Sequence, residues 1–122
     1  MKNICIALMI CSAFLLGCTN ASEEDLIDQP PQLPDPVTYV DHVKPIIDAN
    51  CLNCHSDPPQ NGAPSSLVDY GDVTNGYING NLLNRISGQP GDTGFMPEGG
   101  NRLPQLSIDI IEKWETDGFQ NN

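Results

Sequence analysis

The sequence predicts an all-α fold, in which one small domain of three to five helices follows a disordered N-terminal tether. Apolar residues recur at helical spacing in the second half of the chain, and nothing there reads as alternating strands and helices. The segment before them, residues 18–36, combines prolines with acidic residues and resists both helix and sheet. Residues 37–122 suffice for one domain but are marginal for a core built from side chains alone.

The first helix is expected at residues 38–50. Thr38 suits the N-cap position, and Asp41 three positions later completes an approximate capping box. Pro45 is expected to kink or divide this helix, because proline lacks the backbone N–H that a helix interior uses. The apolar face of the helix is predicted to consist of Val40, Val43, Ile46 and Ile47.

The rest of the domain is expected to contain a loop and three further helices. Prolines and glycines predict a loop at residues 56–66 and two short helices at 68–74 and 81–86, separated by Gly76 and Gly80. The last helix is expected at 107–116, starting at Ser107 and followed by Gly118 at the C′ position. Its expected contacts are a hydrophobic staple between Leu106 and Ile111 and an apolar stripe formed by Ile110, Ile111 and Trp114.

The most informative motif is a C-x-x-C-H sequence, formed by Cys51-Leu52-Asn53-Cys54-His55. Two thiols three positions apart on a helical turn can each add to one vinyl group of a porphyrin. The histidine that follows is then carried under the iron as its proximal axial ligand. The motif therefore indicates one covalently bound haem c, with Cys51 and Cys54 as thioether partners and His55 on the metal.

Two other interpretations of the cysteine pair compete with haem attachment. A structural zinc site needs four nitrogen or sulfur ligands, and no cysteine follows Cys54. A thioredoxin-like redox pair needs a β-α-β setting, which the pattern does not support. The chain contains a single C-x-x-C-H sequence, which predicts one haem rather than several.

The second axial ligand is expected to be Met96. It lies in the sequence Gly94-Phe95-Met96-Pro97, where turn residues can hold one side chain inward, and its thioether suits iron that changes oxidation state. The alternatives are a Met96 that only fills a gap in the core, ligation by His42, or an open site filled by water.

The N-terminus resembles that of a bacterial lipoprotein. A positive start and an apolar run predict a signal peptide at residues 1–17, and Leu15-Leu16-Gly17-Cys18 resembles a lipoprotein box with Cys18 as the lipidated residue. The alternative is an ordinary signal peptide that happens to contain cysteine. Removal of the signal would take Cys5 and Cys11 with it, so every cysteine has an assignment and none is left for a disulfide.

The charge of the chain excludes one class of partner. There are 16 acidic residues against 5 lysines and arginines, a net charge of −11, and loss of Lys2 with the signal peptide would make it −12. Nucleic acid is therefore not expected as a partner, because phosphate backbones attract basic surfaces. An acidic surface favours pairing with a basic patch on another protein, although it can also serve solubility alone.

These features together resemble the class I, His/Met monohaem cytochromes c. The similarity covers nearly all of residues 37–119 and is carried by residues 43–47, the motif at 51–55, residues 82–86, Phe95-Met96-Pro97 and the tail helix. It implies that the first and last helices pack around the haem crevice through Val40, Val43, Ile111 and Trp114. It also implies that a backbone carbonyl after the motif, for which Pro64 is the candidate, holds the His55 ring. Separately, Arg85 or Arg102 is a candidate to bind a haem propionate.

The expected function is one-electron transfer by a carrier that is not an enzyme and takes no small-molecule substrate. The protein is expected in the bacterial cell envelope, anchored by Cys18 to a membrane, the outer membrane being favoured, and facing the periplasm or the cell surface. Its partners would be redox proteins. The alternative is a haem-based gas or redox sensor, or the haem module of a larger enzyme complex, in which Met96 is displaceable.

Overall fold

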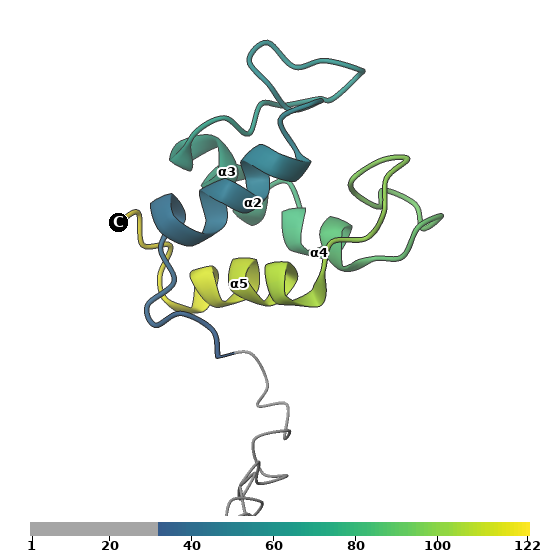
Figure 1. Ribbon diagram of the computed structural model, residues 1–122. Helices are drawn as coiled ribbons and strands as arrows, with labels where there is room; N and C mark the ends of the chain where they lie inside the picture. The colour runs from purple at the N-terminus through teal and green to yellow at the C-terminus, as the bar shows by residue number, and fades with distance from the viewer. Residues whose placement is uncertain (1–31) are drawn as a thin grey trace, which may run out of the picture. The chain divides into compact units, whose positions relative to one another are not determined.

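The computed structural model describes residues 32–122, so the predicted signal peptide, Cys18 and most of the linker at 18–36 lie outside the described residues. Regular structure between residues 32 and 122 is helical throughout, with four α-helices, one π-helical turn and no β-strand. The all-α prediction is therefore confirmed for this part of the chain (Figure 1).

The first helix has two parts. A π-helical turn, η2 (Tyr39–Val43), runs directly into α2 (Lys44–Asn50). Pro45 is the second residue of α2, and it has no backbone N–H to donate to a carbonyl of η2. The wider turn just before it is marked by the Val43 N–H, which donates to the Thr38 carbonyl five residues back at 3.3 Å. Pro45 therefore divides the helix, as predicted.

The π-helical turn changes which residues face the core. Tyr39, Val43 and Ile47 are buried, whereas Val40 is 49% exposed, so the prediction that Val40 lies on the apolar face is wrong. The cap also differs from the expectation. Thr38 is the N-cap residue, but its N–H donates to Nδ1 of His42 at 3.0 Å, so His42 takes the place expected for Asp41.

The two short helices are α3 (Tyr70–Ile78) and α4 (Leu82–Ser87). Helix α3 begins later than predicted because Asp69 caps it, accepting the N–H of Asp72 at 2.9 Å. Gly76 was predicted to separate the helices but lies inside α3. A Cβ at this position would come within 2.9 Å of a Leu67 methyl carbon, so a side chain here would make the Leu67 side chain shift.

The last helix, α5 (Gln105–Thr116), begins two residues earlier than predicted. Its N-cap residue is Pro104, whose carbonyl accepts the N–H of Ser107 at 3.0 Å, so Ser107 lies inside the first turn and is not the start. The predicted staple is also wrong, because Leu106 is 40% exposed while Ile111 is fully buried. The C-terminal prediction is confirmed, since Gly118 has the positive φ of +82° that a C′ residue needs.

The core lies where η2 and α4 both contact α5, and α3 contacts α4 (Figure 1). The expected packing of the first helix against the last is confirmed through Val43, Ile111 and Trp114, all fully buried. Tyr39 and Tyr70 pack against the Trp114 ring with centroids 5.8 and 6.0 Å away. This core packs against α2. Residues 51–66 continue from the C-terminal end of α2 as turns and a loop.

Candidate functional site

The C-x-x-C-H sequence continues α2 by one turn. The Cys51 N–H donates to the Ile47 carbonyl at 2.8 Å, so Cys51 is still tied to the helix. The N–H groups of Cys54 and His55 both return to the Cys51 carbonyl, at 3.1 and 2.9 Å. Both cysteines are free thiols and half-buried. The motif is therefore a compact turn with two unpaired sulfurs and one imidazole.

The two sulfur atoms have different surroundings. Cys51 packs against the hydrophobic core, and this burial raises the pKa of its thiol to about 11. The Cys54 sulfur lies 3.7 Å from the side-chain amide nitrogen of Asn61, in the loop that follows. Cys51 therefore packs against the core, and Cys54 lies beside a polar loop.

His55 is held by the backbone of that loop. Its Nδ1 atom lies 2.7 Å from the carbonyl oxygen of Ser65, and a carbonyl only accepts, so Nδ1 carries the proton. The other ring nitrogen, Nε2, keeps the lone pair that can bind a metal. The expectation that Pro64 supplies this carbonyl is wrong by one residue. The Leu67 N–H donates to the His55 carbonyl at 2.8 Å, and this bond sets which residue of the loop reaches the ring.

Met96 lies in a second loop, anchored separately from the first. Its side chain is half-buried and packs against the same hydrophobic core as Cys51. Its backbone N–H donates to the carbonyl of Arg85 in α4 at 3.0 Å. The preceding Phe95 is only 8% exposed and anchors the loop by burial. The loop therefore presents the thioether from a fixed backbone, although no sequence pattern identifies α4 as its support.

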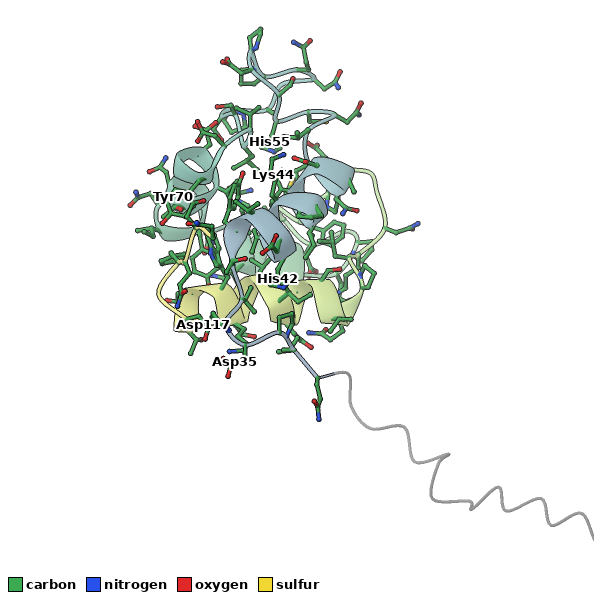
Figure 2. The ribbon with its side chains drawn as sticks, turned by 60° about the vertical axis from the view of Figure 1, so that its left-hand side comes forward. Asp35, His42, Lys44, His55, Tyr70 and Asp117 are labelled. Carbon is green, nitrogen blue, oxygen red and sulfur yellow. The ribbon has the colours of Figure 1, made fainter. Side chains whose placement is uncertain are left out.

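His42, the alternative ligand, has another role in the structure. Its Nδ1 atom accepts the Thr38 N–H at the start of η2. Figure 2 shows His42 lying between His55 at one end of the domain and Asp35 and Asp117 at the other. The structure thus uses one of its two ring nitrogens for helix capping.

Both arginines bond to oxygen atoms of the protein itself. Arg85 donates from Nε to the Gly80 carbonyl at 3.2 Å and from Nη1 to the Gly94 carbonyl at 3.3 Å. Arg102 donates from Nε to the Gly88 carbonyl at 3.2 Å and from Nη2 to the Gln105 side chain at 2.8 Å. Neither set of bonds was expected, because the partners lie on other segments and follow no sequence pattern.

Two hollows lie beside these loops. One, of about 220 Å³, is lined by polar residues that include Ser65 and Asp72. The other, of about 360 Å³, is lined by Arg85, Gly94 and Phe95 among others. Neither is lined by Cys51, Cys54, His55 or Met96.

The side chains of this turn are of the kind that could hold a covalently attached haem. Two free thiols stand three positions apart on one turn, and the neighbouring imidazole has its outer nitrogen free. A structural zinc site would need four such ligands. Among residues 32–122, no three histidine, cysteine or acidic side chains form a group that could hold a metal ion.

Comparisons of the chain with protein-family models, with curated proteins and with solved structures give no match. Within the described part of the chain, no helix has both the length and the apolar character required to cross a membrane.

Proposed function

We propose that the protein is a monohaem c-type electron carrier, tethered to a membrane of the bacterial cell envelope. The observation that carries the proposal is the turn at residues 51–55, in which two free thiols adjoin an imidazole whose Nδ1 atom is bonded to Ser65. When bound, haem would supply an iron that takes up and releases one electron.

Each residue of the proposed haem site would have a distinct role. Cys51 and Cys54 would hold the haem covalently through their sulfurs. The Ser65 carbonyl accepts the Nδ1 proton of His55, which leaves Nε2 as the nitrogen that would bind the iron. Met96 would supply a further ligand from a loop anchored on α4. Two protein ligands leave no place for a substrate, which favours a carrier over an enzyme.

The partner is proposed to be a redox protein with a basic patch. Residues 32–122 contain 12 acidic residues against four lysines and arginines, a balance of −8. Both lysines in this range pair with carboxylates, Lys44 with Asp48 and Lys113 with Asp35 and Asp117. Since the cations are already engaged within the protein, the charge left for a partner is negative.

The tether is proposed to be a lipid on Cys18, outside the described residues. The arrangement of the domain suits such an anchor. Asp35, close to the start of the described chain, lies at the end of the domain opposite His55 (Figure 2). A haem on His55 would then be remote from the point where the tether joins. The His55 end of the domain would stay accessible to a partner. The change Cys18→Ser should move the protein from the membrane fraction to the soluble fraction.

The experiment that tests the carrier proposal is absorption spectroscopy of the oxidised and reduced protein. The oxidised form should show the weak red band that methionine ligation gives to ferric haem, and Met96→Ala should abolish it while His42→Ala leaves it intact. The reduced form should resist carbon monoxide at neutral pH. If the native protein binds carbon monoxide as readily as Met96→Ala, the sensor alternative is correct and the carrier proposal is wrong.

A further inference from the structure

Arg85 contacts the loop of Met96 at two points. Its side chain donates from Nη1 to the carbonyl of Gly94, two residues before Met96, at 3.3 Å. Its backbone carbonyl accepts the N–H of Met96 itself at 3.0 Å. A further bond from Nε to the Gly80 carbonyl, at 3.2 Å, fixes the guanidinium against the turn that precedes α4. One residue of α4 therefore bonds to the backbone on both sides of Phe95.

The loop has little regular structure of its own. Between Ser87, where α4 ends, and Gln105, where α5 begins, no residue belongs to a helix or strand. Gly91, Gly94 and Gly99 all have positive φ angles. The backbone bonds inside this loop are short-range turns, such as the Phe95 N–H to the Asp92 carbonyl at 3.1 Å. A loop of this kind needs outside contacts to hold one conformation, because fixing each backbone residue has an entropic cost.

Gly94 shows how closely the guanidinium and the loop approach each other. A Cβ at Gly94 would lie 3.0 Å from Nη1 of Arg85, so a side chain there would make the guanidinium shift by a few tenths of an ångström. Gly99 provides a contrast within the same loop. Its φ is also positive, at +71°, but a Cβ there would meet nothing within 4 Å. Both glycines thus have a positive φ, but only at Gly94 would a side chain also contact Arg85.

We propose that Arg85 is a positioning residue for Met96: its charged donors hold the loop so that the thioether stays directed at the metal. This inference rests on the proposed function, since it assumes that Met96 is an axial ligand. It assigns Arg85 a task other than binding a haem propionate, since two of its five N–H donors, at Nε and Nη1, bond to the Gly80 and Gly94 carbonyls. Hydrogen bonds from a charged donor are stronger than neutral ones, so arginine suits this position better than a neutral side chain.

The first test is the exchange rate of the Met96 backbone N–H, which does not depend on electron transfer. Arg85→Leu should increase hydrogen exchange at Met96 at least tenfold, because the loop loses the side-chain bonds that hold it against α4. Arg102→Leu is the matched control, since it removes an arginine within the same loop whose bonds reach the carbonyls of residues 87–88 and not Gly94 or Met96. An unchanged exchange rate at Met96 in Arg85→Leu would overturn the proposal.

The second test is the affinity of the ferric protein for imidazole, which competes with Met96 for the iron. Arg85→Leu should bind imidazole at least tenfold more tightly, whereas Arg102→Leu should keep the native affinity. Gly94→Ala should act like Arg85→Leu, and Gly99→Ala should have a much smaller effect. Should Arg85→Leu leave imidazole binding unchanged and shift only the reduction potential, Arg85 binds a propionate and the proposal is wrong.

The same experiments separate this inference from the proposed function. If Met96→Ala does not alter the spectrum of the native protein, Met96 is not a ligand and both proposals fail. If Met96→Ala abolishes the red band but Arg85→Leu and Gly94→Ala leave exchange and imidazole affinity unchanged, only the role of Arg85 is refuted. Should Arg85→Leu fail to fold, the pair Gly94→Ala and Gly99→Ala decides the role of Arg85 through the same two measurements.

Discussion

The Nδ1 atom of His55 lies 2.7 Å from the carbonyl oxygen of Ser65, ten residues further along the chain. The loop between them closes on itself, because the Leu67 N–H also donates to the His55 carbonyl at 2.8 Å. These two bonds hold the ring and its backbone together and leave Nε2 as the nitrogen that can bind a metal. The proposed proximal ligand is therefore oriented by the polypeptide itself.

Leu67 is predicted to maintain this orientation. It is 7% exposed, and its methyl group lies against Gly76 of α3, so Leu67→Ala should reduce the free energy of unfolding by about 2–5 kcal/mol. It should also speed exchange of the His55 ring N–H, because the Ser65 carbonyl loses its support. Leu106→Ala makes the same change at a position that is 40% exposed and should have little effect on either quantity. Equal effects of the two substitutions on ring exchange would refute the role of Leu67.

Tyr39 and Tyr70 are predicted to respond in opposite ways to loss of the hydroxyl group. The Tyr39 hydroxyl is buried without a hydrogen-bond partner among the described residues, whereas the Tyr70 hydroxyl donates to the Phe119 carbonyl at 2.8 Å. Tyr39→Phe should leave the free energy of unfolding unchanged or raise it by up to about 1 kcal/mol, because an unsatisfied buried group is removed. Tyr70→Phe should lower it by about 0.5–1.5 kcal/mol. Urea unfolding measures both, and a clear loss of stability in Tyr39→Phe would show that its hydroxyl has a partner.

Asp117 is predicted to make stability depend on acidity. Hydrogen bonds from Lys113 and from the Val37 N–H hold the pKa of this carboxyl below its ordinary value. The folded protein therefore binds the proton less readily than the unfolded chain, so the contribution is present above a pH of about 4 and is lost as the pH falls below that. Asp117→Asn should show a smaller drop in Tm between neutral and acidic pH than the native protein.

The control for this prediction is Asp57→Asn, which changes an exposed carboxylate outside the network around Lys113. It should retain the native dependence of Tm on pH. If Asp117→Asn loses as much Tm on acidification as the native protein does, the link between this carboxylate and acid stability is wrong.

The acidic surface is predicted to favour positively charged redox reagents. At low ionic strength a small cationic oxidant should react with the reduced protein faster than an anionic oxidant of similar driving force, because the net charge attracts one and repels the other. Added salt should narrow the difference, since the Debye length falls to about 10 Å at 0.1 M. Stopped-flow rates over a series of salt concentrations measure this. If the rates do not depend on salt, the net charge does not affect the reaction with redox reagents and serves solubility alone.

The helices were largely predictable, because apolar periodicity and local turn chemistry reflect contacts between near neighbours. Where the structure differs from the prediction, another local preference prevails. The π-helical turn before Pro45 rotates Val40 out to solvent and brings Tyr39 in. Helix α5 starts ahead of Ser107 because the Pro104 carbonyl accepts the Ser107 N–H and closes the first turn.

The candidate site was predictable only where its residues are contiguous. Cys51, Cys54 and His55 share one turn, so their spacing alone indicates their chemistry. The carbonyl that holds His55 was predicted one residue away, at Pro64, because loop register depends on the Leu67 bond and not on composition. The bonds of Arg85 to the Met96 loop join segments that are separate in the sequence, and no local pattern indicates them.

The measurement that tests the central claim most directly is the intact mass of the purified, exported protein under denaturing conditions. Thioether bonds survive denaturation, so the native protein should carry the added mass of one haem, and the double variant Cys51→Ser, Cys54→Ser should carry none. A native protein whose domain has the unmodified mass, with two thiols that react freely with an alkylating reagent, would contradict the account.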